Sequence, residues 1–254
     1  MDEQRVAVVT GGSGGIGGAI AGALAAAGHA VVSLDQAGGS GAEPDQAGGS
    51  GAGLGREVVD LGREVVDLGR EEEVRAAAGA VLGRYGRCDV LVHAAAAFDR
   101  ADLASVSLPA WRRVQAVNVE SALLLAQAFV PGMAARGFGR IIFVTSDTVW
   151  APPAGDMLPY VTSKGALVAL ARTLAVGLGA DGIAVTCVAP GLTATPTAQR
   201  DLPAAAFDEV RSRQALPRTL VPDDVAATVA FLASDAAAAL TGQTLCTDGG
   251  LILR

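Results

Sequence analysis

The segment VVTGGSGGIGGAIAGAL, residues 8–24, carries the strongest structural signal in the chain. It joins a short β-branched run to an Ala- and Gly-rich stretch that is typical of a helix. Glycines at its centre permit a tight turn and let the backbone approach a pyrophosphate at the start of the helix. A glycine-rich match alone is weak, but this one lies between a predicted strand and a predicted helix. The segment therefore predicts a dinucleotide site formed by Gly11, Ser13, Gly14, Gly15, Ile16 and Gly17.

Apolar runs and helical stretches alternate along the rest of the chain. The runs are continuously apolar rather than alternating, as expected for parallel strands that are covered on both faces. The predicted strands are residues 5–10, 30–35, 63–68, 88–94, 140–146, 183–190 and 243–248. The predicted helices are residues 16–28, 71–84, 109–136, 161–180 and 222–234. This pattern predicts a three-layer, doubly wound α/β Rossmann fold with a seven-stranded parallel sheet, in a single domain over residues 1–254.

Two duplications interrupt this pattern. The sequence DQAGGSGA occurs at 35–42 and 45–52, and LGREVVD occurs at 54–60 and again at 61–67. The first predicts a flexible Gly-rich insertion over residues 36–56, with a partner-binding lid as the less favoured alternative. In the second, two identical segments compete for one strand position. We favour the second copy, because REEEV follows it and begins a helix with acidic residues in the first turn.

Composition excludes several classes of function. The net charge of −7 argues against a nucleic-acid backbone or an anionic membrane as the main partner. The apolar runs are short and interrupted, and the N-terminus lacks the pattern of a secretory signal. Cys88, Cys187 and Cys246 lie in apolar segments without metal-ligand spacing, which favours buried thiols in a reducing, cytoplasmic compartment. His29 and His93 are too isolated to indicate a metal site.

Asp35 ends the second predicted strand, eighteen residues after Gly17. A carboxylate at this position can accept hydrogen bonds from an adenosine ribose, and it would repel a 2′-phosphate. Gln36 follows it rather than an arginine, and the glycine loop contains no basic residue. These features favour NAD(H) over NADP(H) as the cofactor. The alternative is that Asp35 only begins a turn.

The segment PYVTSKGAL, residues 159–167, contains the only lysine of the chain. Tyr160 and Lys164 are four residues apart, so on a helix they share one face. A free phenol has a pKa near 10, and a nearby ammonium favours the phenolate. We therefore expect Lys164 to lower the pKa of Tyr160, which would make the phenol a usable acid/base at neutral pH. The alternative is a solvated pair on an exposed helix.

Together these features resemble the short-chain dehydrogenase/reductase family, over essentially the whole chain. The resemblance is carried by TGGSGGIG (10–17), YVTSK (160–164), the Ser that ends RIIFVTS, the Asn in VNVES, APGLTAT (189–195) and the terminal TGQTLCTDGG. It implies that Tyr160 is the general acid/base and that Lys164 binds the cofactor ribose. It further implies that Ser146 hydrogen-bonds the substrate oxygen, and that Asn118 holds a helix irregularity and a water in a proton relay.

The resemblance also implies further cofactor contacts. Asp67 and Leu68 stand where the family contacts adenine, with Asp60 as the duplicate of Asp67, and the nicotinamide half is expected against Pro190, Gly191, Thr193 and Thr195. The family's Asn-Asn-Ala-Gly is replaced here by His93, Ala94, Ala95 and Ala96, which keeps backbone contacts but loses the Asn side chains. Ser146 lies fourteen residues before Tyr160, where thirteen is commoner, and Thr148 is a less favoured substitute for it.

Two segments should enclose the substrate: an apolar wall with Thr148, Trp150 and Met157, and a mobile lid over residues 192–215 that begins with Leu192. Such a lining suits an uncharged hydrophobic or aryl ketone or secondary alcohol. SDTVW and the terminal DGGLILR are similar to bacterial 1-phenylethanol dehydrogenases of this family. Arginines at positions 200, 211 and 213 keep open a 3-oxoacyl-type ketoreductase that uses NADPH.

A third reading is a dinucleotide-binding regulator without turnover, which is expected to lack one of Ser146, Tyr160 and Lys164. All three residues are present. The resemblance also implies a homotetramer.

Overall fold

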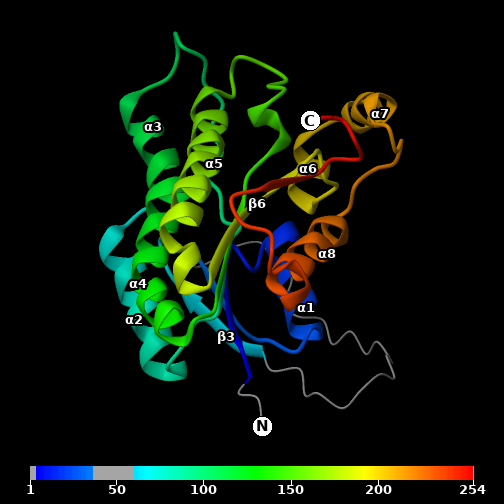
Figure 1. Ribbon diagram of the computed structural model, residues 1–254. Helices are drawn as coiled ribbons and strands as arrows, with labels where there is room; N and C mark the ends of the chain where they lie inside the picture. Colours follow the sequence, from blue (N-terminus) through cyan, green and yellow to red (C-terminus); the bar gives the residue numbers. More distant parts are fainter. Residues whose placement is uncertain (1–3, 37–59, 254) are drawn as a thin grey trace.

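A seven-stranded parallel sheet forms the centre of the computed structural model, which describes residues 4–36 and 60–253 (Figure 1). The strand order is β3-β2-β1-β4-β5-β6-β7. The strands are β1 (Val6–Thr10), β2 (Ala30–Asp35), β3 (Asp60–Val65), β4 (Val90–His93), β5 (Gly139–Val144), β6 (Ile183–Pro190) and β7 (Thr244–Thr247). The predicted doubly wound fold is therefore confirmed. The predicted Gly-rich insertion lies, apart from Gln36, outside the described residues.

Helices cover both faces of the sheet, as Figure 1 shows. One core lies under α2 (Glu71–Tyr85), α4 (Ser121–Arg136) and α5 (Leu158–Leu178), and it includes Leu91, Phe129 and Phe143. The other lies under α1 (Gly15–Ala26) and α8 (Pro222–Ala233). The remaining helices are α3 (Leu108–Gln115), α6 (Pro196–Asp201) and α7 (Ala204–Arg213). This arrangement explains the continuously apolar strands, because both faces of the sheet are buried.

The strand at the edge of the sheet differs from its predicted boundaries. We predicted residues 63–68, whereas β3 spans Asp60–Val65 and pairs with β2, with Asp35 opposite Val65. The second LGREVVD copy supplies every residue of β3 except the first, so the favoured copy is the one used. The strand ends early because the chain turns at Asp67, whose side chain accepts a hydrogen bond from the amide of Gly69 at 2.9 Å.

Two helical stretches, 108–136 and 158–181, are long and apolar enough to cross a membrane by length and composition alone. From the sequence we predicted only short, interrupted apolar runs. Both stretches pack against the sheet in this structure, and Phe129, Met133 and Leu167 belong to its core. A long helix that covers a sheet satisfies the same length and hydropathy criterion, so these two helices are accounted for by packing.

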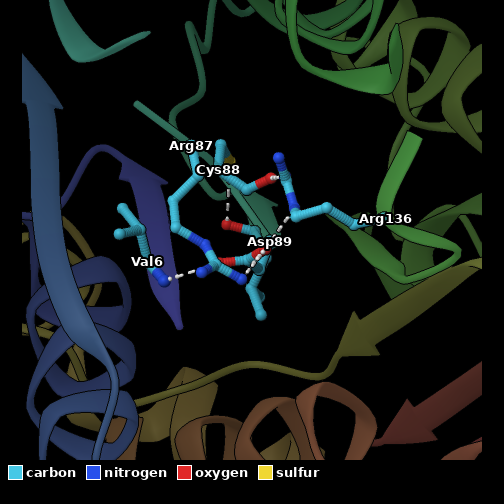
Figure 2. Close-up of polar contacts among 6 residues, drawn as sticks. Val6, Arg87, Cys88, Asp89 and Arg136 are labelled. Carbon is cyan, nitrogen blue, oxygen red and sulfur yellow. Dashed lines mark hydrogen bonds and ion pairs between the residues drawn. The ribbon is translucent and has the colours of Figure 1, made fainter. Parts of the chain in front are cut away.

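A buried carboxylate joins the amino ends of the two central strands (Figure 2). Asp89 is completely buried and accepts hydrogen bonds from the amide of Val6 at 2.9 Å and from Arg87 Nε at 2.7 Å. Arg136, the last residue of α4, donates to its second oxygen at 3.1 Å. The carboxylate therefore connects β1, β4 and α4 through hydrogen bonds and ion pairs, and it is itself shielded from water.

We expect Asp89→Ala to lower the free energy of unfolding by about 3–5 kcal/mol, because it leaves two partly buried guanidinium groups without this carboxylate. Urea unfolding measures the change. Asp235→Asn is the matched control, since Asp235 pairs with Arg5 while its side chain is 71% exposed. The control should change the stability by less than about 1 kcal/mol. Equal effects of the two substitutions would contradict the assigned role of Asp89.

Candidate functional site

A cavity of about 400 Å³ opens at the carboxyl ends of β1, β2 and β4. The strand order changes direction between β1 and β4, and in doubly wound sheets ligands bind at such a switch point. Most predicted cofactor residues line the cavity. They are Gly11, Ser13, Gly14, Gly15, Ile16, Gly17, Asp35, Leu68, Ala94, Ala95, Ala96 and Thr195. Asp67, Tyr160, Lys164, Pro190, Gly191 and Thr193 do not belong to this lining.

The glycine loop reverses the chain between β1 and α1. Gly11 has a φ of 70°, which favours glycine, and its amide donates to the carbonyl of Leu34 at 2.9 Å. A Cβ on Gly17 would overlap the carbonyl oxygen of Gly11, so that position also requires glycine. Helix α1 begins at Gly15 after the N-cap residue Gly14, without a side-chain cap and without an acidic residue in its first turn. The start of α1 therefore suits an anion in the cavity.

Small residues after β4 form the facing wall. Thr10 accepts hydrogen bonds at Oγ1 from the amides of Ala94 and Ala95, both at 3.1 Å, which ties the ends of β1 and β4 together. His93 is fully buried, and its Nε2 lies 2.7 Å from Ser121 Oγ. Burial, aided by the charge of Lys164, lowers the pKa of His93 to about 3, so this histidine is neutral. It replaces the family's Asn as a structural residue.

Two carboxylates lie at one end of the site. Asp35 accepts hydrogen bonds from the amide of Ser13 at 2.7 Å, from the Ser13 hydroxyl and from the amide of Gln36 at 2.9 Å. The Gln36 side chain donates to Asp67 at 3.1 Å and so links the two acids. Asp35 is thus more than the start of a turn, since it also anchors the glycine loop. Arg113 also lines the cavity, and it pairs with Asp99.

The expected triad converges beside this cavity. Ser146 follows β5, while Tyr160 and Lys164 lie one turn apart on α5. Tyr160 is partly buried, and Ser146 lies close enough to lower the pKa of its phenol. Lys164 is only 1% exposed, and its Nζ donates to the carbonyl of Val144 at 2.8 Å. The same nitrogen lies 5.5 Å from the centre of the Tyr160 ring. The pair is therefore enclosed and not a solvated pair on a helix surface.

The expected effect of Lys164 on the phenol is wrong for this structure. Burial raises the pKa of Tyr160 to about 12, and the charge of Asp147 adds to the rise while the Ser146 hydrogen bond opposes it. Burial also lowers the pKa of Lys164 to about 8. The ammonium donates to the Val144 carbonyl, and desolvation of the phenol is the largest cause of the shift in its pKa.

Asn118 lies within the expected helix irregularity, a π-helical turn over Ala116–Glu120 that joins α3 to α4. Its side chain is fully buried. It accepts from the amide of Ala97 at 2.7 Å and donates to Ser163 Oγ at 2.8 Å. Ser163 in turn donates to the carbonyl of Tyr160 at 2.7 Å. Asn118 therefore connects the wall after β4 to the helix turn that carries the tyrosine.

The predicted substrate residues come from several segments of the chain. Thr148 donates from Oγ1 to Ser146 Oγ at 2.9 Å, Trp150 packs against the core, and Met157 is buried. The predicted lid contains α6 and α7, and Leu192 is partly buried at its start. Gly191, directly after β6, lies close to the residue that follows β7, because a Cβ on Gly191 would lie 3.0 Å from Asp248 Cα.

Sequence reasoning missed several site residues. Phe98 makes an edge-to-face contact with Tyr160, with ring centroids 4.9 Å apart, and it is 46% exposed. Asp147 is buried next to Ser146. No local pattern marks Phe98, since it follows a run of alanines, whereas the acid after Ser146 is visible in the sequence.

Comparisons with known proteins agree with this geometry. A family model described as enoyl-(acyl carrier protein) reductase matches residues 11–252. The chain is 41% identical to a probable short-chain type dehydrogenase/reductase of Bradyrhizobium diazoefficiens, over 98% of this chain and 88% of that one. It is 36% identical to the cis-4-hydroxycyclohexanecarboxylate dehydrogenase of Sinomonas cyclohexanicum, over 97% and 96%. A blue fluorescent protein from a metagenomic library, solved with NADPH, superposes with a TM-score of 0.85 at 30% identity, over 98% of each chain.

The buried lysine predicts a specific pH dependence of stability. The pKa of Lys164 is about 8 in the folded chain, against 10.5 for a lysine side chain that is exposed to water. Between these values the unfolded chain binds a proton that the folded chain has released, so the free energy of unfolding rises with pH. We expect a rise of about 3 kcal/mol in wild type relative to Lys164→Met, measured by urea unfolding from pH 7 to about 10.5. Parallel profiles for the two proteins would contradict this.

Proposed function

Because the chain belongs to the short-chain dehydrogenase/reductase family, we propose that it is an NAD(H)-dependent oxidoreductase that interconverts a secondary alcohol and a ketone. The convergence of Ser146, Tyr160 and Lys164 carries this proposal. Ser146 lowers the pKa of Tyr160, and Lys164 is buried one helical turn away, with its Nζ 5.5 Å from the centre of the Tyr160 ring. The site thus brings together an acid/base, a donor for the substrate oxygen and a cation.

The cavity fits a dinucleotide. Its floor is a glycine loop where a Cβ at Gly15 would approach Thr195 to 3.0 Å, so bulkier side chains would fill the space. The uncapped start of α1 suits a pyrophosphate. The loop residues and Ala94, Ala95, Ala96, Leu68 and Thr195 would hold the cofactor, together with Asp67, Pro190, Gly191 and Thr193 in the positions the family uses. When bound, nicotinamide supplies a hydride to the carbonyl carbon or accepts one from the carbinol.

Asp35 favours NAD(H) in this proposal. Its carboxylate would receive the ribose hydroxyls and would repel a 2′-phosphate at the same place. Gln36 and Asp67 are the neighbouring side chains at that end, joined by their hydrogen bond, and neither is basic. Among the described residues that line the cavity, the one arginine is Arg113, which already pairs with Asp99.

Residues of the chain would transfer the proton to and from the substrate oxygen. Tyr160 holds its proton at neutral pH, since its pKa is raised to about 12, and this state suits donation to a ketone oxygen. Ser146 would hydrogen-bond the same oxygen. In the working complex Lys164 would bind the ribose and stabilise the phenolate that forms. Asn118 would position the π turn and hold a water of the proton relay.

Aromatic contacts support an apolar or aryl substrate. Phe98 packs on Tyr160 yet remains half-exposed, so one face of an aromatic ring is available beside the acid/base. Trp150, Met157 and Leu192 would extend this apolar lining. The relative from Sinomonas is named for a carbon ring that carries both a hydroxyl group and a carboxylate, and its name supports only the secondary alcohol of this proposal.

A second candidate is a 3-oxoacyl-type ketoreductase that uses NADPH. The description of the matching family model, which names an acyl-carrier substrate, favours it. Two of the three arginines that could bind an acidic carrier already form ion pairs with neighbouring carboxylates. Arg200 pairs with Asp201 at 2.8 Å and Arg211 pairs with Asp208 at 2.9 Å. We therefore prefer the uncharged substrate.

Cofactor choice is tested by following the oxidation of NADH and of NADPH with a panel of aryl and aliphatic ketones. We expect faster turnover with NADH and with aryl ketones. Asp35→Ser combined with Gln36→Arg should move the preference toward NADPH by at least roughly tenfold, because it removes a repulsive charge and adds an attractive one. A wild-type preference for NADPH with 3-oxoacyl thioesters would favour the second candidate.

The role of the lysine is tested by Lys164→Arg. We expect the variant to fold but to lose turnover by roughly a hundredfold or more, because a planar guanidinium cannot replace a compact ammonium at an enclosed site. Tyr160→Phe should lose turnover as well while it still binds the cofactor. Circular dichroism and cofactor fluorescence provide the folding and binding controls. Near-normal activity of Lys164→Arg would contradict the mechanism.

A further inference from the structure

We propose that Asp147 is a positioning residue that competes for the hydroxyl proton of Ser146 and so controls whether that proton reaches the reacting oxygen. The inference rests on the proposed function, because the reacting oxygen is that of the alcohol or ketone. Asp147 begins a short 3-10 turn over Asp147–Val149, directly after Ser146, and it is only 7% exposed.

The hydrogen bonds that Ser146 accepts are fixed, so only the acceptor of its hydroxyl proton can change. Ser146 Oγ accepts from Thr148 Oγ1 at 2.9 Å and from the amide of Thr148 at 3.3 Å. A serine hydroxyl has two acceptor lone pairs and a single proton, so both lone pairs are in use. The proton is donated to Asp147 Oδ1 at 3.3 Å. The second group that it can serve is the phenol of Tyr160, whose pKa Ser146 also lowers. The hydrogen bond from Ser146 favours the charged form of either group, but it can serve only one at a time.

The surroundings place the charge change of Asp147 near neutral pH. Asp248, which follows β7, and Tyr160, on α5, are the titratable groups whose charge is coupled to it. Asp248 accepts hydrogen bonds from the amides of Gly250 at 2.9 Å and Ile252 at 2.8 Å. Burial and the charge of Asp248 raise the pKa of Asp147 to about 6.

The charge state of Asp147 then affects catalysis through Ser146. An ionised Asp147 holds the serine proton in a charge-assisted hydrogen bond, which is stronger than a neutral one. A protonated Asp147 releases it to the substrate oxygen. Ketone reduction and alcohol oxidation cross the same transition state, so ionisation of Asp147 lowers kcat/KM in both directions by the same factor.

The test is the pH profile of kcat/KM between pH 5 and 9, in both directions, for wild type and Asp147→Asn. We expect the wild-type value to fall roughly tenfold, above a pKa near 6, relative to the profile of Asp147→Asn. That variant lacks this fall and keeps only the pH dependence of the proton that the reaction itself takes up or releases. Asp147→Ala should also lack it, which guards against a local defect specific to asparagine. Asp181→Asn is the matched control: it removes an exposed carboxylate before β6, at the opposite edge of the sheet, and should keep the fall.

A second readout needs no turnover. Infrared difference spectra of the wild-type chain should show a protonated carboxylic acid that ionises near pH 6, and Asp147→Asn should lack that band. Absence of turnover in wild type with every ketone and alcohol would overturn the proposed function. An unchanged kcat/KM profile in Asp147→Asn, or the infrared band persisting in that variant, would overturn the inference about Asp147.

Discussion

The close approach of Gly17 to the carbonyl oxygen of Gly11 is the constraint on which the site depends. A side chain at residue 17 would push the start of α1 away from the end of β1. The Thr10 hydroxyl holds the facing chain after β4 by two amides, so both walls of the cavity are fixed to one strand. The cavity is therefore a direct product of short-range backbone geometry at the switch point of the sheet.

Desolvation decides the electrostatics of the acid/base pair. A cation near a phenol lowers its pKa, and burial of the phenol raises it. Here the Lys164 ammonium donates to the Val144 carbonyl, and the net shift of Tyr160 is upward. A spacing of four residues on a helix shows that two side chains share a face, but their solvent exposure and the direction of the ammonium depend on what packs over them.

Much of the architecture could be predicted from the sequence because its signals are local. Apolar periodicity and glycine placement predicted all seven strands, and the helix start after the second duplicate selected the right copy. The end of β3 was missed by three residues, since the turn at Asp67 depends on a side-chain contact. Contacts between distant segments, such as Phe98 on Tyr160 and Asp147 near Asp248, produce no periodic pattern in the sequence. They could be identified only from the structure.

The Asp89 network lies at the amino edge of the sheet, whereas the cavity lies at the carboxyl edge. Its partners, Val6, Arg87 and Arg136, are all remote from the residues that line the cavity. The protein thus separates the residues that hold its strands together from those that select a ligand. Such a separation makes the scaffold evolvable, because loops at one edge can accumulate substitutions that change specificity while the opposite edge preserves the fold.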